Sequence, residues 1–210
     1  MTVREEQAIA FVIDDDELVR ASIADLLRSV GIPAQVFAST REFLDCKRPD
    51  AAACIVLDVR LPGGSGLELQ RKLAESGIDL PVIFISGHGD IPMSVRAMKA
   101  GAVAFLTKPL REQELLDAVH VAIERDRARR RQNQRLGELR KRLTSLTARE
   151  NEILRLIVSG LANKQIAYDL KLSAMTVKVH RSHIMRKMQA RSLVDLVRMA
   201  DQLGVPADQP

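Results

Sequence analysis

The sequence predicts two domains: an α/β domain with a doubly wound, five-stranded parallel sheet, and a separate all-α domain of four helices. Five apolar runs alternate with helical patterns up to residue 124, and such continuous runs are typical of parallel strands buried on both faces. From residue 147 onward the pattern is helical only, with short helices and tight turns. We therefore expect an α/β domain over 7–124, a basic helical linker over 125–146 and a helical domain over 147–210.

The strands of the first domain are expected at 9–13, 34–38, 54–58, 81–85 and 103–106. Helix signals follow them in turn. Ser39 and Ser65 each begin a Ser-x-x-Glu capping box, and Asp90 is positioned to cap a helix that has Pro92 in its first turn. Gly31 is a helix stop. Five strand–helix units of this kind predict a parallel sheet with right-handed crossovers.

Polar side chains follow four of these strands where each strand ends, namely Asp14 and Asp15, Asp58, Ser86 and Lys108. Because parallel strands place their carboxyl ends on one edge of a sheet, we expect these residues to meet there. Two or three carboxylates suit Mg²⁺, which prefers oxygen ligands. Asp58 is then positioned to attack a phosphoryl group as a carboxylate nucleophile, with Ser86 as a hydroxyl donor and Lys108 as a point cation.

Each of these residues also has a plainer interpretation. The aspartates 14–16 suit a solvated helix N-terminus, Ser86 suits a turn, and Lys108 suits a surface charge. The interpretation as a site depends on their coincidence at matched strand ends.

Composition and charge indicate the compartment and a partner. The N-terminus lacks the features of a signal peptide, and no apolar run approaches the roughly 20 residues that span a bilayer, so we expect a soluble cytoplasmic protein with no membrane partner. The two cysteines suit a reducing compartment, with Cys54 in the core. Residues 1–124 carry 13 Lys and Arg against 19 Asp and Glu, whereas 125–210 carry 19 against 8. The basic half is a candidate for binding a polyanion, and a solvated surface is the alternative.

The first domain resembles the receiver domain of bacterial two-component response regulators over residues 7 to about 124. The motifs are the acidic pair after the first strand, D-V-R-L-P-G-G-S-G after the third, S-G-H-G-D after the fourth and K-P after the fifth. The resemblance implies that a sensor histidine kinase phosphorylates Asp58. It also implies that Asp15, Asp58 and the backbone carbonyl of Arg60 bind Mg²⁺, with Asp14 helping through water.

The resemblance bears on several neighbouring positions as well. The spacing to Arg20 in D-D-x-x-x-x-R favours residues 14 and 15 as the acidic pair and leaves Asp16 as a solvated extra residue. Ser86 stands where many relatives have Thr. Phe105 falls at the aromatic switch position, and its alternative role is that of a core residue. The Lys108–Pro109 peptide bond is expected to be cis.

The stretch 112–146 joins the domains. An apolar stripe at 115, 116, 119 and 123 is followed by a polar, arginine-rich run without proline, so we expect one long helix. Three roles stay open for it: a solvated linker, a short coiled-coil seam in a dimer, or contact with DNA phosphates.

The second domain has the pattern of a helix-turn-helix. A capping box at 147–150 begins its first helix, Gly160 ends that helix, a second helix covers 163–170, and Ser173 caps a third that runs to about Met188. On the third helix Val177, Ile184 and Met188 share one face. Lys178, Val179, Ser182 and Arg186 lie on the other face.

The outward face of the third helix carries the candidate DNA contacts. Val179 is a branched apolar residue on a polar face, where it suits a thymine methyl group, and Lys178 suits guanine or phosphate. The candidate DNA-contacting residues are Asn163, Lys164, Thr176, Lys178, Val179, His180, Arg181 and Ser182. A four-helix interaction module with a basic face is the alternative.

The motifs L-T-A-R-E-N-E-I-L, G-L-A-N-K-Q-I-A and L-S-A-M-T-V-K-V-H-R resemble the C-terminal DNA-binding domain of LuxR-type regulators. With the receiver in front, the whole chain is similar to the FixJ/NarL class. The resemblance implies a regulator that is not an enzyme beyond assisting its own aspartyl phosphorylation and dephosphorylation. Phosphorylation is expected to favour a homodimer that binds double-stranded promoter DNA, and RNA polymerase is a further candidate partner.

Three alternatives remain at this point. An aspartyl-phosphate phosphatase or phosphotransferase uses the same chemistry, but no second acid follows Asp58 two residues on. A quorum-type LuxR regulator needs an aromatic-rich pocket, and this chain has no Trp and one Tyr. A regulator with the receiver fold but without phosphorylation is disfavoured by the full acidic, hydroxyl and lysine set.

Overall fold

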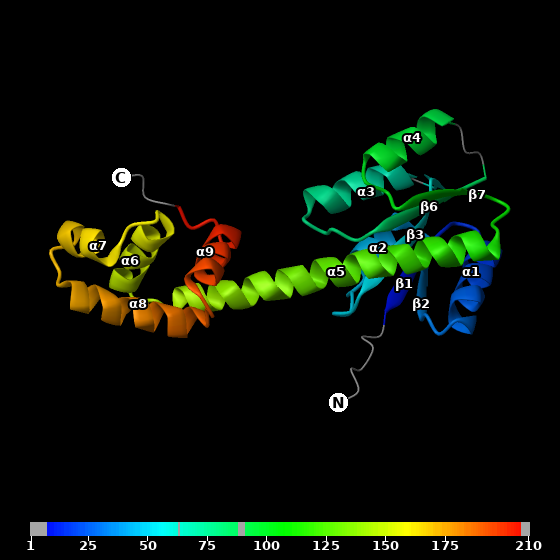
Figure 1. Ribbon diagram of the computed structural model, residues 1–210. Helices are drawn as coiled ribbons and strands as arrows, with labels where there is room; N and C mark the ends of the chain where they lie inside the picture. The colour runs from blue at the N-terminus through cyan, green and yellow to red at the C-terminus, as the bar shows by residue number, and fades with distance from the viewer. Residues whose placement is uncertain (1–7, 63, 88–90, 207–210) are drawn as a thin grey trace. The chain divides into compact units, whose positions relative to one another are not determined.

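The structure, a computed structural model, describes residues 8–62, 64–87 and 91–206 (Figure 1). It divides into two compact units, of which the first ends at Arg130 and the second begins at Arg131. Helix α5 (Glu112–Thr144) is continuous, as the sequence predicts. The domain boundaries expected from the sequence stay predictions.

The helix cap expected at Asp90 lies outside the described residues. Within the described chain, no helix is long and apolar enough to span a membrane.

The first unit contains the predicted five-stranded parallel sheet, with the order β2-β1-β3-β6-β7. The strands are β1 (Ile9–Ile13), β2 (Ala34–Phe37), β3 (Ala53–Asp58), β6 (Val82–Ser86) and β7 (Ala104–Thr107). All four pairings are parallel. Strand order reverses between β1 and β3, and ligands of open α/β sheets bind at the carboxyl ends of the strands at such a point.

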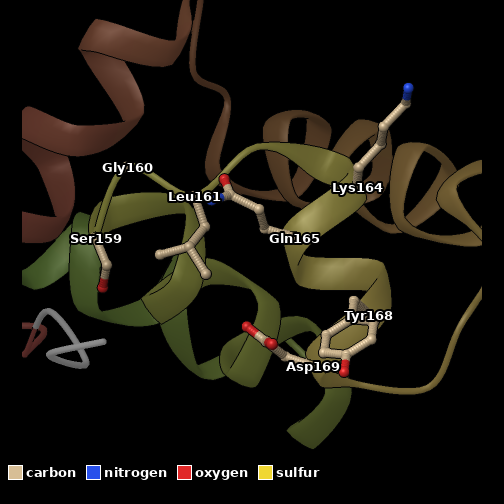
Figure 2. Close-up of a pocket in the computed structure, with 7 residues that line it drawn as sticks. All are labelled: Ser159, Gly160, Leu161, Lys164, Gln165, Tyr168 and Asp169. Carbon is tan, nitrogen blue, oxygen red and sulfur yellow. The ribbon is translucent and has the colours of Figure 1, made fainter.

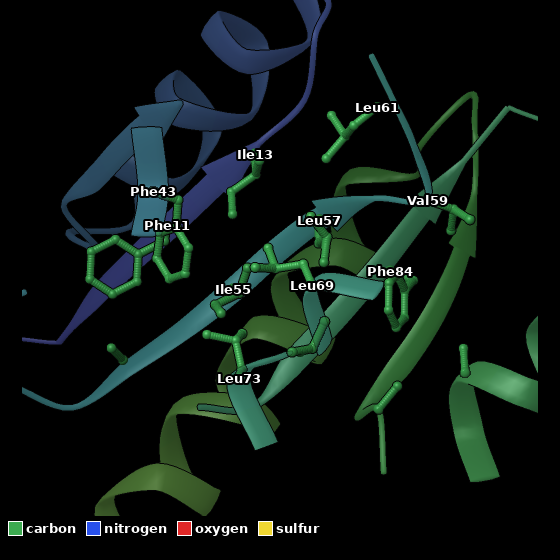
Figure 3. Close-up of a cluster of buried hydrophobic side chains, with 14 of the residues drawn as sticks. Phe11, Ile13, Phe43, Ile55, Leu57, Val59, Leu61, Leu69, Leu73 and Phe84 are labelled. Atoms are coloured by element: carbon green, nitrogen blue, oxygen red, sulfur yellow. The ribbon is translucent and has the colours of Figure 1, made fainter. Parts of the chain in front are cut away.

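Helices cover both faces of the sheet and create two apolar cores. Helices α2 (Thr40–Asp45), α3 (Gly66–Glu75) and α4 (Ile91–Lys99) pack on one face, around Phe11, Phe43 and Phe84 (Figure 3). Helices α1 (Glu17–Ser29) and α5 pack on the other. Side chains along a strand alternate between the faces, so strands that are apolar at every position feed both cores. This explains why the strand sequences are continuous apolar runs.

Polar side chains cap the N-termini of α1 and α3, and both caps differ from what the sequence predicts. Asp16 is not merely a solvated extra residue, because its carboxylate caps α1 by accepting from the N–H groups of Leu18 at 2.8 Å and Val19 at 3.3 Å. Ser65 caps α3, but without the predicted capping box. A capping box requires the hydroxyl to accept from the N–H of Glu68, whereas here it accepts from the N–H of Leu67. A short hairpin of β4 (Arg60–Leu61) and β5 (Gly64–Ser65) lies between β3 and α3, in a stretch expected to be a loop.

Helix α3 approaches β3 closely at Gly66. A Cβ atom at this position would lie 2.4 Å from the backbone oxygen of Asp58 and 3.2 Å from the ring of Phe84. A contact of 2.4 Å with backbone is not relieved by a side-chain rotation. Gly66 therefore allows α3 to begin against the end of the strand that carries Asp58.

A buried carboxylate ties α5 to the other end of β3. Asp126 is fully buried, and its Oδ2 accepts from the N–H of Ala53 at 3.0 Å. Its Oδ1 accepts from Nε of Arg129 at 3.0 Å. A buried charge is tolerated when it is paired and hydrogen-bonded, and both conditions hold here. Arg130 also pairs with Asp50, next to the same strand.

The second unit is all-α, as predicted. After the end of α5 it contains α6 (Ala148–Val158), α7 (Asn163–Asp169), α8 (Ala174–Met188) and α9 (Leu193–Gln202). Its core comprises residues from all four helices, including Ile153, Ile166, Ile184 and Leu196. Gly160 follows α6 with a φ of 84°, a conformation that glycine adopts without strain.

Glu150 braces α6 against α8. It completes the predicted capping box with Thr147, accepting from its backbone N–H at 2.8 Å, and its Oε2 accepts from Nζ of Lys187 at 2.6 Å. Burial alone would raise the pKa of Glu150, but the Lys187 and Thr147 hydrogen bonds lower it to about 2. The folded unit therefore favours the ionised carboxylate.

Substitution of Gly66 by alanine should destabilise the first unit by about 1–3 kcal/mol, the usual cost of forcing extra atoms into a packed site. Urea denaturation measures this. Gly137 in α5 is the matched control, because a Cβ added there would have no described atom within 4 Å. Gly137→Ala should stabilise the helix by about 0.5–1 kcal/mol. Equal stability of Gly66→Ala and the parent would contradict the close approach.

The second unit should lose stability in acid through Glu150. The folded pKa of about 2 lies below the ordinary value of 4.5, so the stabilisation is complete above about pH 5 and is lost as the pH falls toward 2. We expect a loss of roughly 1–2 kcal/mol, because Lys187 is partly exposed to solvent. Hydrogen-exchange protection of α6 and α8 amides measures it. In Glu150→Gln this part of the pH dependence should vanish; an unchanged profile would rule Glu150 out as its source.

Candidate functional site

The carboxyl edge of the sheet gathers the residues that the sequence assigns to a phosphoryl site. Asp14 follows β1, Asp58 ends β3 and Ser86 ends β6, and all three are buried. The register pairs Asp58 with Ile85 and Ser86 with Thr107 across neighbouring strands. Parallel pairing thus brings together residues that are up to 94 positions apart, as between Asp14 and Lys108.

Lys108 is the centre of this cluster. Its Nζ lies 2.7 Å from Oδ2 of Asp14 and 2.6 Å from Oδ2 of Asp58. Its backbone N–H donates to the carbonyl of Ser86 at 2.8 Å, which fixes the start of the loop after β7. The Lys108–Pro109 peptide bond is cis, as expected. One ammonium therefore bridges the acidic residue that follows β1 and the one that ends β3.

Burial and neighbouring charges shift the pKa values of Asp14 and Lys108. Burial raises the pKa of Asp14 above its usual value, although hydrogen bonds from Lys108 and the N–H of Asp16 act in the opposite direction. Burial acts to lower the pKa of Lys108, but its hydrogen bonds to Asp14 and Asp58 outweigh this and the pKa is raised. Lys108 thus stays a cation beside the carboxylates.

The donor set fits a divalent cation. Carboxylate oxygens of Asp14, Asp15 and Asp58 lie within 4.8 Å of one another, and Asp15 is exposed to solvent. Three carboxylates and one ammonium leave two negative charges, which one divalent ion balances. Mg²⁺ is held by few carboxylates and keeps several waters, so an exposed third acid suits it. The resemblance to receiver domains implies Mg²⁺, and these residues match that chemistry.

Backbone and side-chain hydrogen bonds orient the two buried acids. The N–H of Arg60 donates to Oδ1 of Asp58 at 2.8 Å, and the N–H of Asp16 donates to Oδ1 of Asp14 at 2.9 Å. Nη1 of Arg20 donates to the backbone carbonyl of Asp14 at 2.6 Å. The sequence indicated Arg20 only as a spacing marker; its contact with the first strand end emerges only in three dimensions.

Phe105 lies on β7 opposite Phe84 of β6, with ring centroids 6.3 Å apart. It is half-buried and packs against the core on the α3 and α4 side. Its present packing matches the core role considered from the sequence, and its role as a switch stays a prediction.

In the second unit, α8 has the two faces that its spacing predicts. Val177, Ile184 and Met188 are buried in the core. The opposite face exposes Lys178, Val179, Ser182 and Arg186 to solvent. The turn between α7 and α8 and the cap at Ser173 complete the expected helix-turn-helix.

The remaining candidate DNA contacts are held in different ways. Nη1 of Arg181 donates to Oδ1 of Asn163 at 3.0 Å, so this pair joins α8 to the start of α7. The hydroxyl of Thr176 lies 2.8 Å from that of Ser173 within the helix cap. Nδ1 of His180 is buried without a hydrogen-bond partner among the described residues, so this atom is not presented to a phosphate.

Lys164 lies on the outer surface of α7, where it lines a shallow depression between the end of α6 and α7 (Figure 2). Its ammonium extends away from the other lining residues, and Tyr168 and Asp169 lie one turn along the helix (Figure 2). Lys164 is exposed to solvent, and its role as a DNA contact stays a prediction.

Comparison with known proteins agrees with both halves of this description. The family model of the response regulator receiver domain matches residues 10–120, and that of the luxR family of bacterial regulatory proteins matches 144–200. Nodulation protein W of Bradyrhizobium diazoefficiens is 52% identical over 96% of this chain and 89% of its own length. The transcriptional regulatory protein FixJ of Azorhizobium caulinodans is 48% identical over 94% of each chain.

Among solved structures, the response regulator StyR matches with a TM-score of 0.84 at 45% identity, covering 93% of this chain and 99% of StyR. The sequence motifs, the strand-end acids with their lysine and the helix-turn-helix therefore have one common explanation. The chain belongs to the two-component response regulators that join a receiver domain to a LuxR-type DNA-binding domain, and it is a transcriptional regulator.

Proposed function

We propose that Asp58 accepts a phosphoryl group from a sensor histidine kinase, and that this modification controls binding of the second unit to promoter DNA. The observation that supports it most is the position of Lys108, whose Nζ contacts both Asp58 and Asp14. A cation beside a buried carboxylate, at the edge where parallel strands end, suits a nucleophile that must approach an anionic group.

The proposed transfer is a displacement at phosphorus. A carboxylate oxygen of Asp58 forms a bond to the phosphorus of the kinase phosphohistidine, and the phosphorus–nitrogen bond breaks. The electron pair of that bond returns to the imidazole nitrogen, so the kinase regains a histidine. Lys108 stays protonated and offers donors to the phosphoryl oxygens, while Ser86 contributes its hydroxyl.

Mg²⁺ is the proposed cofactor. Asp15, Asp58 and the backbone carbonyl of Arg60 would hold it, with Asp14 acting through water, and the ion would neutralise oxygens of the phosphoryl group. Buried Asp14 and half-buried Lys108 would then line the site beside the ion. The N–H of Arg60 donates to Oδ1 of Asp58, which supports the assignment of Arg60 to this site.

The switch follows from the added charge. Phosphorylated Asp58 draws Lys108 and Ser86 toward the phosphoryl oxygens, and Phe105, half-buried beside Phe84, repacks in response. The altered surface favours a homodimer or frees the DNA-binding unit, a change that requires only a few kcal/mol between two states. The receiver assists its own phosphorylation and dephosphorylation and has no other substrate.

The proposed target is double-stranded promoter DNA in the cytoplasm. Helix α8 enters the major groove, with Lys178, Val179 and Ser182 toward base edges. The backbone contacts are assigned to Asn163, Lys164, Thr176, His180 and Arg181. A twofold dimer binds half-sites about one helical turn apart. Residues 125–146 act as the link between domains at 7–124 and 147–210; Asp126 within this range is buried against β3, so the solvated part of the linker begins beyond it. RNA polymerase is a further partner.

Replacement of Asp58 by asparagine should abolish Mg²⁺-dependent labelling by acetyl phosphate, because the amide is not a nucleophile. Mass spectrometry detects the adduct of about 80 Da, the mass of one phosphoryl group, and Asp45→Asn on the exposed side of α2 is the control that should retain it. Labelling that persists in Asp58→Asn would place the acceptor elsewhere.

Replacement of Lys178 by alanine should weaken binding to a duplex selected from random DNA by about 1–3 kcal/mol if the lysine reads a base. A scrambled duplex is the control, and its affinity should change little. Fluorescence anisotropy measures both. Equal losses on the two duplexes would make Lys178 a phosphate contact, and no loss on either would remove it from the interface.

A further inference from the structure

An apolar side chain that the core does not use lies at the start of the recognition helix. Met175 is the second residue of α8, and 68% of it is exposed to solvent. The helix already packs through Val177, Ile184 and Met188, which are buried. Met175 is also absent from the cap, which is made by Ser173 and Thr176. Its side chain is therefore not part of the described core of the second unit.

Met175 shares a surface with Val179, one turn further along α8. Residues four apart on a helix are neighbours on one face, and helical side chains lean toward the N-terminus, so Val179 leans toward Met175. Val179 is 46% exposed. The two side chains form an apolar pair in the N-terminal half of the helix, the half whose side chains contact base edges in a helix-turn-helix.

The charge of α8 indicates what kind of molecule the apolar pair contacts. The segment 174–188 contains Lys178, Arg181, Arg186 and Lys187 and no acidic residue. Lys187 is paired with Glu150, whereas Lys178 is exposed next to Val179 in sequence. A cationic helix that carries a small apolar pair suits a polyanion with isolated apolar groups. The thymine C5-methyl is such a group, since it is the apolar feature that a base pair presents in the major groove. The flexible thioether of methionine can adjust to the position of a methyl group.

We propose that Met175, together with Val179, recognises thymine methyl groups and so contributes to the choice of promoter sequence. The inference rests on the proposed DNA binding by α8 and deepens it. Val179 alone offers an apolar surface for one methyl group. Met175 extends the apolar surface by one turn toward the helix N-terminus, so the two residues read thymines at different positions of the half-site.

The test replaces single thymines by uracil, which removes only the methyl group. The probe is a duplex selected from random DNA with the full chain in the presence of acetyl phosphate and Mg²⁺. For the parent, uracil at a contacted position should weaken binding about fourfold, the equivalent of ~0.8 kcal/mol for one buried carbon. In Met175→Ala at least one of these positions should become insensitive to uracil, while the position read by Val179 keeps its effect.

Two further variants test whether an apolar contact by Met175 causes the uracil effect. Met175→Leu keeps an apolar side chain and should retain the uracil effect, whereas Met175→Gln keeps the length but not the polarity and should lose it. Because Met175 is exposed, all three variants should unfold at the parent temperature. An unchanged uracil pattern in Met175→Ala would overturn the inference and leave the proposed function intact. Failure of the parent chain to enrich any duplex would overturn both.

Discussion

The first unit depends on one electrostatic contact, the bridge that Lys108 makes between Asp14 and Asp58. Three strand ends supply these residues, so the contact exists only if the parallel sheet is complete and in register. Buried carboxylates are costly without a partner, and removal of the ammonium would leave two of them close together. The same arrangement also leaves two excess negative charges at a partly open edge. That excess suits a divalent cation, which would in turn offset the negative charge of an incoming phosphoryl group.

Much of this fold was predictable because its signals are local. Apolar runs long enough for one strand, each followed by a cap residue and a helical period, define β1, β3 and β6, and the strand-end residues Asp58 and Lys108 could be placed by topology alone. The helix-turn-helix was predictable for the same reason, since Ser173 and the periodicity of Val177 and Ile184 lie within one short segment. The matches to receiver and luxR family models agree with these local signals.

The features that escaped prediction are contacts between distant segments. Asp126 lies within a polar run of the sequence, yet it is buried. Its carboxylate accepts from the N–H of Ala53, 73 residues earlier, and the local sequence does not indicate this contact. The pairing of Arg181 with Asn163 depends on the angle between two helices, which periodicity does not specify. The β4–β5 hairpin has two residues in each strand, too few for an alternation pattern. The exposure of Met175 likewise required knowledge of which side chains fill the core.

Asp126 has a mechanical consequence. Strand β3 carries Asp58 at one end and, at the other, the amide that Asp126 holds, so six residues spanning roughly 20 Å connect the acidic edge to helix α5. At that turn the helix cannot lift from the sheet without removing the acceptor of the buried Ala53 N–H. We therefore expect any tilting of α5 over the sheet to pivot about this anchored turn, which lies at the opposite end of β3 from Asp58.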